Sequence, residues 1–164
     1  KKHVGEFRKN NIWNITEYDK EGNTVKKWVN GVMNWGVLFI RKVNGKLEWF
    51  ENGDKDEDGK YVGEIKNGKP NGKGKESFPG GGMYEGDYKD GKPNGIGTES
   101  FSNGSKYVGK YKDGNFYGQG TLSFLIGLKM TGEWRKNPWN IKVYDINGNI
   151  TGKFVNGVIQ QGPP

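Results

Sequence analysis

The sequence predicts an all-β fold: a single-layer, elongated antiparallel sheet of stacked β-hairpin repeats. Three observations lead to this prediction, namely a repeat of 23 residues, an alternation of side chains with period two, and an unusual composition. Glycine occupies 29 of the 164 positions, and 6 Trp, 8 Tyr and 8 Phe accompany a hydrophobic fraction of only 31%. This composition excludes both a thick aliphatic core and a disordered polar tract. The chain is therefore expected to fold by packing rings against glycine backbone.

The repeat is clearest in the middle of the chain, where tyrosine recurs every 23 residues at Tyr61, Tyr84 and Tyr107. Glycines follow each tyrosine at the same places. A fixed period of this length is typical of repeat architectures in which each repeat is one supersecondary unit. The three tight repeats are 61–83, 84–106 and 107–129.

Each tight repeat is predicted to be one β-hairpin followed by a turn. Tyr84–Tyr88 alternates rings and glycine on one face with charge on the other, which is the period of a strand. Residues 90–95 are dense in turn formers, and 96–101 are expected to form the returning strand. Glycine is needed on the ring face because a side chain there would collide with a ring.

The two ends of the chain resemble each other. Trp13 and Asn14 match Trp139 and Asn140, and the similarity extends into the turns that follow. Terminal repeats are usually atypical because each protects an open edge, so both ends are interpreted as divergent repeats or caps. The chain is expected to be a single repeat domain, 1–164, divided into 1–32, 33–60, 61–129 and 130–164.

Residues 33–60 are expected to form a bridging hairpin around the turn Asn44-Gly45, a strong hairpin signal. All the tryptophans lie outside the tight repeats, where larger rings are expected to supply core that glycine-rich hairpins lack. They are Trp13, Trp28, Trp35, Trp49, Trp134 and Trp139.

The composition excludes several kinds of site. There is no cysteine and one histidine, His3, so disulfides, Cys-His and Ser-His-Asp triads and multi-histidine metal sites are excluded. The net charge of +7 permits anionic partners without requiring them. No apolar run approaches the roughly 20 residues of a membrane-spanning helix, so a soluble or peripheral protein is expected. The sequence does not indicate the cellular compartment, and it leaves open whether a leader peptide precedes Lys1.

The pattern Tyr-x-Gly-x-x-x-x-Gly-x-x-x-Gly-x-Gly, repeated at 23 residues, resembles the MORN (membrane occupation and recognition nexus) family. The segments 61–83, 84–106 and 107–129 match it closely, and 1–60 and 130–164 resemble divergent MORN-like repeats. The resemblance implies a sheet of stacked hairpins that serves as a scaffold for protein contacts or self-association and, in some members, for membrane attachment. It implies no enzyme and no cofactor, since the chain has no room for the catalytic domains that some members carry.

Lysines recur at two positions of the repeat and are the first candidate binding residues: Lys66, Lys89 and Lys112 in one row, and Lys69 and Lys92 in another. Stacked hairpins would align each row at roughly 9.6 Å, a cationic strip suited to anionic lipid headgroups. Acidic residues two positions away on the same strands favour the alternative of an ordinary solvated face.

A ring-bearing face with two carboxylates is the second candidate. It is predicted to hold Tyr61, Tyr84, Tyr107, Tyr88, Tyr111, Phe78, Phe101, Phe124, Glu76 and Glu99. Exposed rings there would stack on carbohydrate, and the carboxylates would favour a cationic ligand. Catalysis by the carboxylate pair is not expected, because Leu122 stands at their position in the third repeat.

Asp54, Asp56 and Asp58 read like the opening of a calcium loop, with Gly59 supplying a sharp turn. Ile65 stands where the loop requires a bidentate glutamate, so a solvated turn is the favoured interpretation and no metal is expected. The leading functional hypothesis is a non-catalytic scaffold that binds protein partners or itself, as a homodimer. An anionic-membrane module and a carbohydrate-binding surface are the alternatives, and nucleic acid is not an expected partner.

Overall fold

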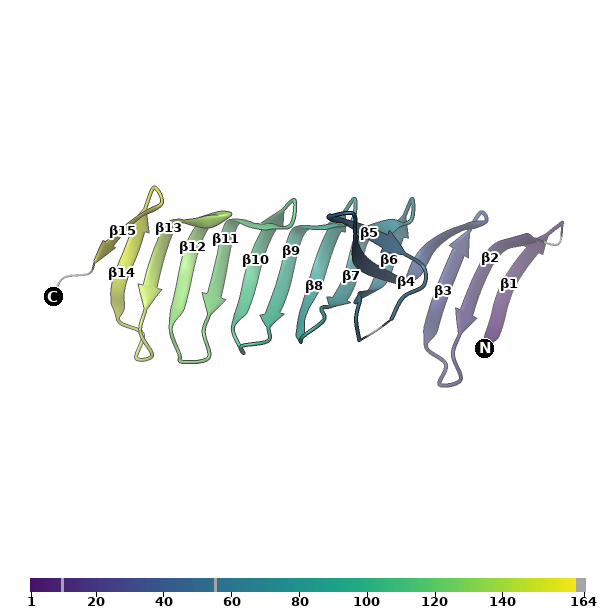
Figure 1. The fold of residues 1–164 in the computed structure, drawn as a ribbon, viewed down its shortest axis with the longest axis horizontal. Helices are drawn as coiled ribbons and strands as arrows, with labels where there is room; N and C mark the ends of the chain where they lie inside the picture. Colours follow the sequence, from purple (N-terminus) through teal and green to yellow (C-terminus); the bar gives the residue numbers. More distant parts are fainter. Residues whose placement is uncertain (10, 55, 162–164) are drawn as a thin grey trace. The chain divides into compact units, whose positions relative to one another are not determined.

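The computed structural model describes residues 1–9, 11–54 and 56–161. These residues form β-strands and no helix, which confirms the all-β fold class (Figure 1). Hydrogen bonds join the strands as an open antiparallel meander in sequence order, except that β4 pairs with both β5 and β6. The strands are β1 (Lys2–Arg8), β2 (Asn11–Tyr18), β3 (Thr24–Val29), β4 (Val32–Val43), β5 (Lys46–Phe50), β6 (Gly59–Lys66), β7 (Lys69–Ser77), β8 (Gly82–Lys89), β9 (Lys92–Phe101), β10 (Lys106–Lys112), β11 (Asn115–Ser123), β12 (Lys129–Arg135), β13 (Asn137–Tyr144), β14 (Ile150–Val155) and β15 (Val158–Gln161).

The chain divides into two compact units. The first contains Lys1–Pro79 and Tyr88–Gly91, and the second contains Gly80–Asp87 and Lys92–Pro164. Strand β8 therefore contributes residues to both units. That the whole chain is a single repeat domain with the expected divisions stays a prediction. In the described part of the chain, no helix has the length and apolar character needed to cross a membrane.

Two-residue turns close the hairpins of the tight repeats. Asn67 and Gly68 join β6 to β7 with φ values of 52° and 71°. Two consecutive left-handed residues are the geometry of the hairpin turn that Asn-Gly favours. The returning strand starts directly after each turn, so β9 begins at Lys92. The prediction that this strand begins at Ile96 is wrong, because the turn needs only two residues.

A β-bulge lies at the same place in the first and third tight hairpins. The register shifts after the pair Gly63–Gly74 in β6–β7 and after the pair Gly109–Gly120 in β10–β11. Gly72, in the first bulge, has a φ of 105°, a left-handed value that side chains rarely adopt. The bulge thus requires one of the repeating glycines.

The 23-residue spacing of fully buried side chains begins earlier in the chain than the repeating tyrosines do. In the first unit Ile15, Leu38 and Tyr61 are at most 1% exposed. In the second unit Tyr84 and Tyr107 are equally buried. Aliphatic side chains therefore take the tyrosine position in the divergent N-terminal repeats. The spacing alone could have revealed this, since Ile15 and Leu38 precede Tyr61 by two intervals and one.

The bridging hairpin forms as predicted around Asn44 and Gly45, with φ values of 49° and 81°. The position of its second strand, β5, was not predicted from the sequence. Among the described strands, β5 pairs with β4 alone, and in Figure 1, where it is dark blue, it crosses in front of neighbouring strands. The Trp49 ring lies 5.9 Å from that of Tyr61, edge to face, so the hairpin covers the ring face of the first unit.

Candidate functional site

In the first unit the ring face is a packed layer built on glycine. The Tyr61 ring lies across Gly63 and Gly74, where an added Cβ would collide with it. Its hydroxyl donates a 2.7 Å hydrogen bond to the Glu64 carbonyl oxygen. The Tyr88 ring meets the Tyr61 ring edge to face at 5.0 Å.

The Tyr88 hydroxyl reaches a buried carboxylate in the same unit. It donates to Glu76 Oε2 at 2.9 Å, and Glu76 is only 5% exposed. A buried carboxylate needs such a donor to offset its lost hydration. Glu76 therefore belongs to the packed layer.

The second unit repeats this arrangement. The Tyr84 ring lies across Gly86 and Gly97, and its hydroxyl donates to the Asp87 carbonyl oxygen at 3.0 Å. The Tyr111 ring meets Tyr84 edge to face at 4.9 Å, and its hydroxyl donates to Glu99 Oε2 at 3.1 Å.

Around Tyr107 the partners differ: Trp134, just after the third tight repeat, takes the position of Tyr88 and Tyr111, and Leu122 takes the position of Glu76 and Glu99. The Trp134 ring meets Tyr107 edge to face at 5.6 Å, and its Nε1 donates to the Gly120 carbonyl oxygen at 3.0 Å. The indole thus finds a backbone acceptor where no carboxylate is present. The ring and its polar partner change together.

Burial shifts the ionisation of these groups. It raises the pKa of Tyr107 to about 12, and burial with nearby carboxylates raises the pKa of Tyr84 and Tyr111. Burial also raises the pKa of Glu99, although the hydrogen bond from Tyr111 opposes that shift. At neutral pH the tyrosine hydroxyls therefore remain protonated hydrogen-bond donors.

The raised pKa of Glu99 predicts a pH dependence of stability. Glu99 binds its proton more tightly in the folded protein than in the unfolded chain, where its pKa is about 4.5. The free energy of unfolding therefore falls as the pH rises from about 4.5 through the pKa of the folded state, because the proton is lost. Glu99→Gln removes the titrating carboxyl but keeps a side-chain oxygen that can accept the hydrogen bond from Tyr111. We expect the stability of the variant relative to the unmodified protein to rise between pH 4 and 7, measured by urea unfolding. Parallel curves for the two proteins would contradict the assignment.

The expectation that the tyrosine rings are exposed is wrong. Their relative exposures are 0 to 4%. Tyr61, Tyr84 and Tyr107 each lie over a glycine pair, and Tyr88 and Tyr111 pack edge to face against these rings. A sugar cannot stack on such a ring. The three phenylalanines, Phe78, Phe101 and Phe124, are half-buried, and Phe101 packs at 6.5 Å from Phe116.

The candidate lysines are all exposed and lie beside the hairpin turns. Lys66 and Lys69 pair across the turn between β6 and β7, and Lys89 lies in the same first unit. Lys92 and Lys112 lie in the second unit, where the Lys112 ammonium is 5.0 Å from the centre of the Tyr117 ring. The rows of aligned lysines stay a prediction.

A surface that the sequence did not single out lies on the side of the second unit opposite the buried rings. Here exposed apolar and cationic side chains alternate: Ile96, Val108 and Tyr117 are 62%, 47% and 45% exposed. Ile96 pairs with Lys110 across β9 and β10. We call Ile96, Val108, Lys110 and Tyr117 the outer face.

Two carboxylates of the acidic loop accept hydrogen bonds from the chain itself. Asp58 is buried, and its Oδ2 accepts hydrogen bonds from Arg41 Nη1 at 3.0 Å and the Asp54 backbone at 2.9 Å. Asp54 Oδ1 accepts from the Asp56 backbone at 2.8 Å. In the described residues, Lys55 not being among them, no three metal-ligating side chains come together. These contacts stabilise a loop.

The family model of the MORN repeat matches residues 61–83 and 84–106. Residues 61–106 are thus two MORN repeats. MORN repeats generally serve in scaffolds that contact proteins or membranes, and the family is typically non-catalytic. No curated protein matches the chain. The MORN match leaves out 107–129, which forms the same hairpin but carries Leu125 and Ile126 in its loop.

Proposed function

We propose that this chain is a non-catalytic scaffold whose outer face holds a protein partner. The observation that carries the proposal is the exposure of Ile96, Val108 and Tyr117 among lysines on one face. Apolar side chains that a sheet leaves exposed together are typical of protein interfaces, and tyrosine is enriched among residues that anchor them. The opposite face is filled by the protein's own rings, which supports the outer face as the binding surface.

The lysines around this patch favour an acidic partner. Lys110 pairs with Ile96, and Lys106 pairs with Ser100 and Ser123 on the neighbouring strands. Cationic groups around an apolar centre increase the rate of association with an acidic surface and add specificity. The partner would thus meet an apolar centre with a polar, cationic rim.

An anionic membrane surface is the second candidate, and the exposed cluster of Lys66, Lys69 and Lys89 in the first unit favours it. Each lysine near such a surface contributes about 1 kcal/mol, screened by salt. Carbohydrate binding stays a prediction that only the half-buried phenylalanines support.

One set of variants tests both candidates. Ile96→Asp with Val108→Asp alters the outer face, and Leu47→Asp is the matched control, since Leu47 is 68% exposed in the first unit. The immobilised proteins are exposed to an extract of the source cells, and the folds are compared by circular dichroism. We expect a protein that the unmodified chain and the control retain but the double variant loses.

If the unmodified protein, the double variant and the control all retained the same proteins, the outer face would be rejected as the binding surface. Co-sedimentation with vesicles provides the second arm. Binding confined to anionic vesicles, lost at high salt and weakened by Lys66→Glu with Lys69→Glu, would establish the membrane candidate instead.

A further inference from the structure

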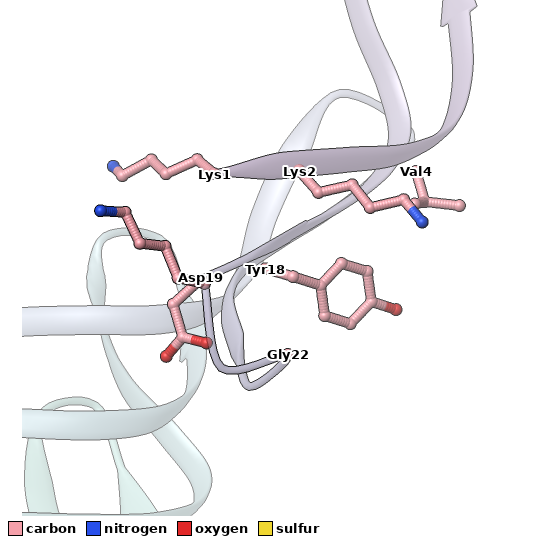
Figure 2. Close-up of a pocket in the computed structure, with 7 residues that line it drawn as sticks. Lys1, Lys2, Val4, Tyr18, Asp19 and Gly22 are labelled. Carbon is pink, nitrogen blue, oxygen red and sulfur yellow. The ribbon is translucent and has the colours of Figure 1, made fainter.

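Two hollows of the same construction lie in the outer repeats, one in each unit. The first has a volume of about 580 Å³ and is lined by Lys2, Val4, Tyr18, Asp19 and Lys20 (Figure 2). The second has a volume of about 390 Å³ and is lined by Lys129, Thr131, Tyr144, Asp145 and Ile146.

The same contacts build both hollows. A lysine faces a tyrosine across two strands, Lys2 with Tyr18 in the first and Lys129 with Tyr144 in the second. An aspartate then begins the loop that closes each hollow. Asp19 Oδ1 accepts a 2.8 Å hydrogen bond from the Asn23 backbone, and Asp145 Oδ1 accepts one of 2.8 Å from Asn149. The asparagine side chain also donates to the aspartate in each loop. This side-chain hydrogen bond and, after it, the backbone hydrogen bond lower the pKa of both aspartates.

The two hollows differ in charge. After the aspartate the first loop has Lys20, whereas the second has Ile146, which is 74% exposed. The lining of the first hollow therefore includes Lys2, Lys20 and one aspartate, whereas the lining of the second includes one lysine and one aspartate. Lys1 also lines the first hollow, but its Nζ lies 2.9 Å from Glu17 Oε1 and is engaged there.

We propose that the first hollow binds the phosphate group of an organic phosphate. Figure 2 shows the ammonium end of Lys2 and the hydroxyl end of Tyr18 directed to the same side of the hollow, where both can donate to one oxyanion. Lysine is a mobile point charge that suits phosphate, and Lys20 adds a second positive charge to the lining. Val4 and the Tyr18 ring offer an apolar wall to the organic part.

NMR titration of the full ¹⁵N-labelled chain tests this assignment with the second hollow as internal control. The probes are inorganic phosphate, glycerol 3-phosphate and vesicles of phosphatidic acid, each compared with sodium chloride at equal ionic strength. We expect saturable shifts at Tyr18 and Lys20 and none at Tyr144 and Ile146. Saturation by glycerol 3-phosphate indicates a soluble ligand, whereas attenuation by phosphatidic acid vesicles alone indicates a lipid headgroup, and either supports the proposal.

Exchanging the distinguishing residue sharpens the test. Lys20→Ile gives the loop of the first hollow the residue that follows the aspartate in the second, and we expect binding to weaken about fivefold. Ile146→Lys is the converse variant, and we expect it to create binding in the second hollow. Lys2→Ala should abolish saturation. Shifts that sodium chloride reproduces, or an affinity that Lys20→Ile leaves unchanged, would overturn the proposal.

Discussion

Replacing Gly97 with alanine is expected to lower the free energy of unfolding by about 2 to 3 kcal/mol, the upper part of the range of about 1 to 3 kcal/mol for atoms forced into a packed core. Gly97 lies under the Tyr84 ring, and an added Cβ would collide with its atoms. The ring cannot withdraw, because its hydroxyl is bonded to the Asp87 carbonyl oxygen and Tyr111 packs against it. Urea unfolding followed by circular dichroism measures the change.

Gly152→Ala is the matched control in the same unit. At this position in β14 an added Cβ meets nothing closer than the Gln160 carbonyl oxygen at 3.6 Å, and the backbone is not left-handed. Alanine in a strand is favoured over glycine by about 0.5 to 1 kcal/mol, so this variant is expected to be neutral or slightly more stable. Equal losses for Gly97→Ala and Gly152→Ala would show that the ring does not set the requirement for glycine.

Trp134→Ala is expected to have the largest effect, about 3 to 5 kcal/mol, as for other buried tryptophans. Trp134 is 3% exposed and packs edge to face against Tyr107 and Phe116. Its removal also leaves the Gly120 carbonyl oxygen without the indole donor. Thermal unfolding followed by circular dichroism measures the loss.

Trp139→Ala serves as the control, because this ring is only half-buried and has the Arg135 guanidinium 4.4 Å from its centre. A cation–π contact of this kind contributes about 1 kcal/mol. If Trp139→Ala proved as damaging as Trp134→Ala, the buried ring layer would not be the principal source of stability in the second unit.

Local sequence signals predicted the tight repeats well. The 23-residue period and the collision of rings with any residue larger than glycine both depend on neighbours within one hairpin. The structure confirms that Tyr61 lies over Gly63 and Gly74. The bridging hairpin at Asn44 and Gly45 was predictable for the same reason.

What the sequence did not reveal depends on contacts between distant residues. The period could not show that Trp49 would fold back over Tyr61 and help to bury a ring that was expected to be exposed. Nor could it show that Glu76 would be buried as the acceptor of a tyrosine from the next repeat. The outer face was missed because Ile96 and Val108 follow no period.

The joint replacement of tyrosine by tryptophan and of glutamate by leucine at Trp134 and Leu122 bears on how such a chain can diversify. A ring, the glycines beneath it and its polar partner form a linked set, so a change in one member is tolerated only with a matching change in another. The hollow-lining residues carry no such linkage, since Lys20 and Ile146 occupy equivalent loops without altering them. Among the repeats of this chain, the ring layer therefore differs by joint replacement, whereas the loops that close the hollows differ one residue at a time and keep the same hydrogen bonds.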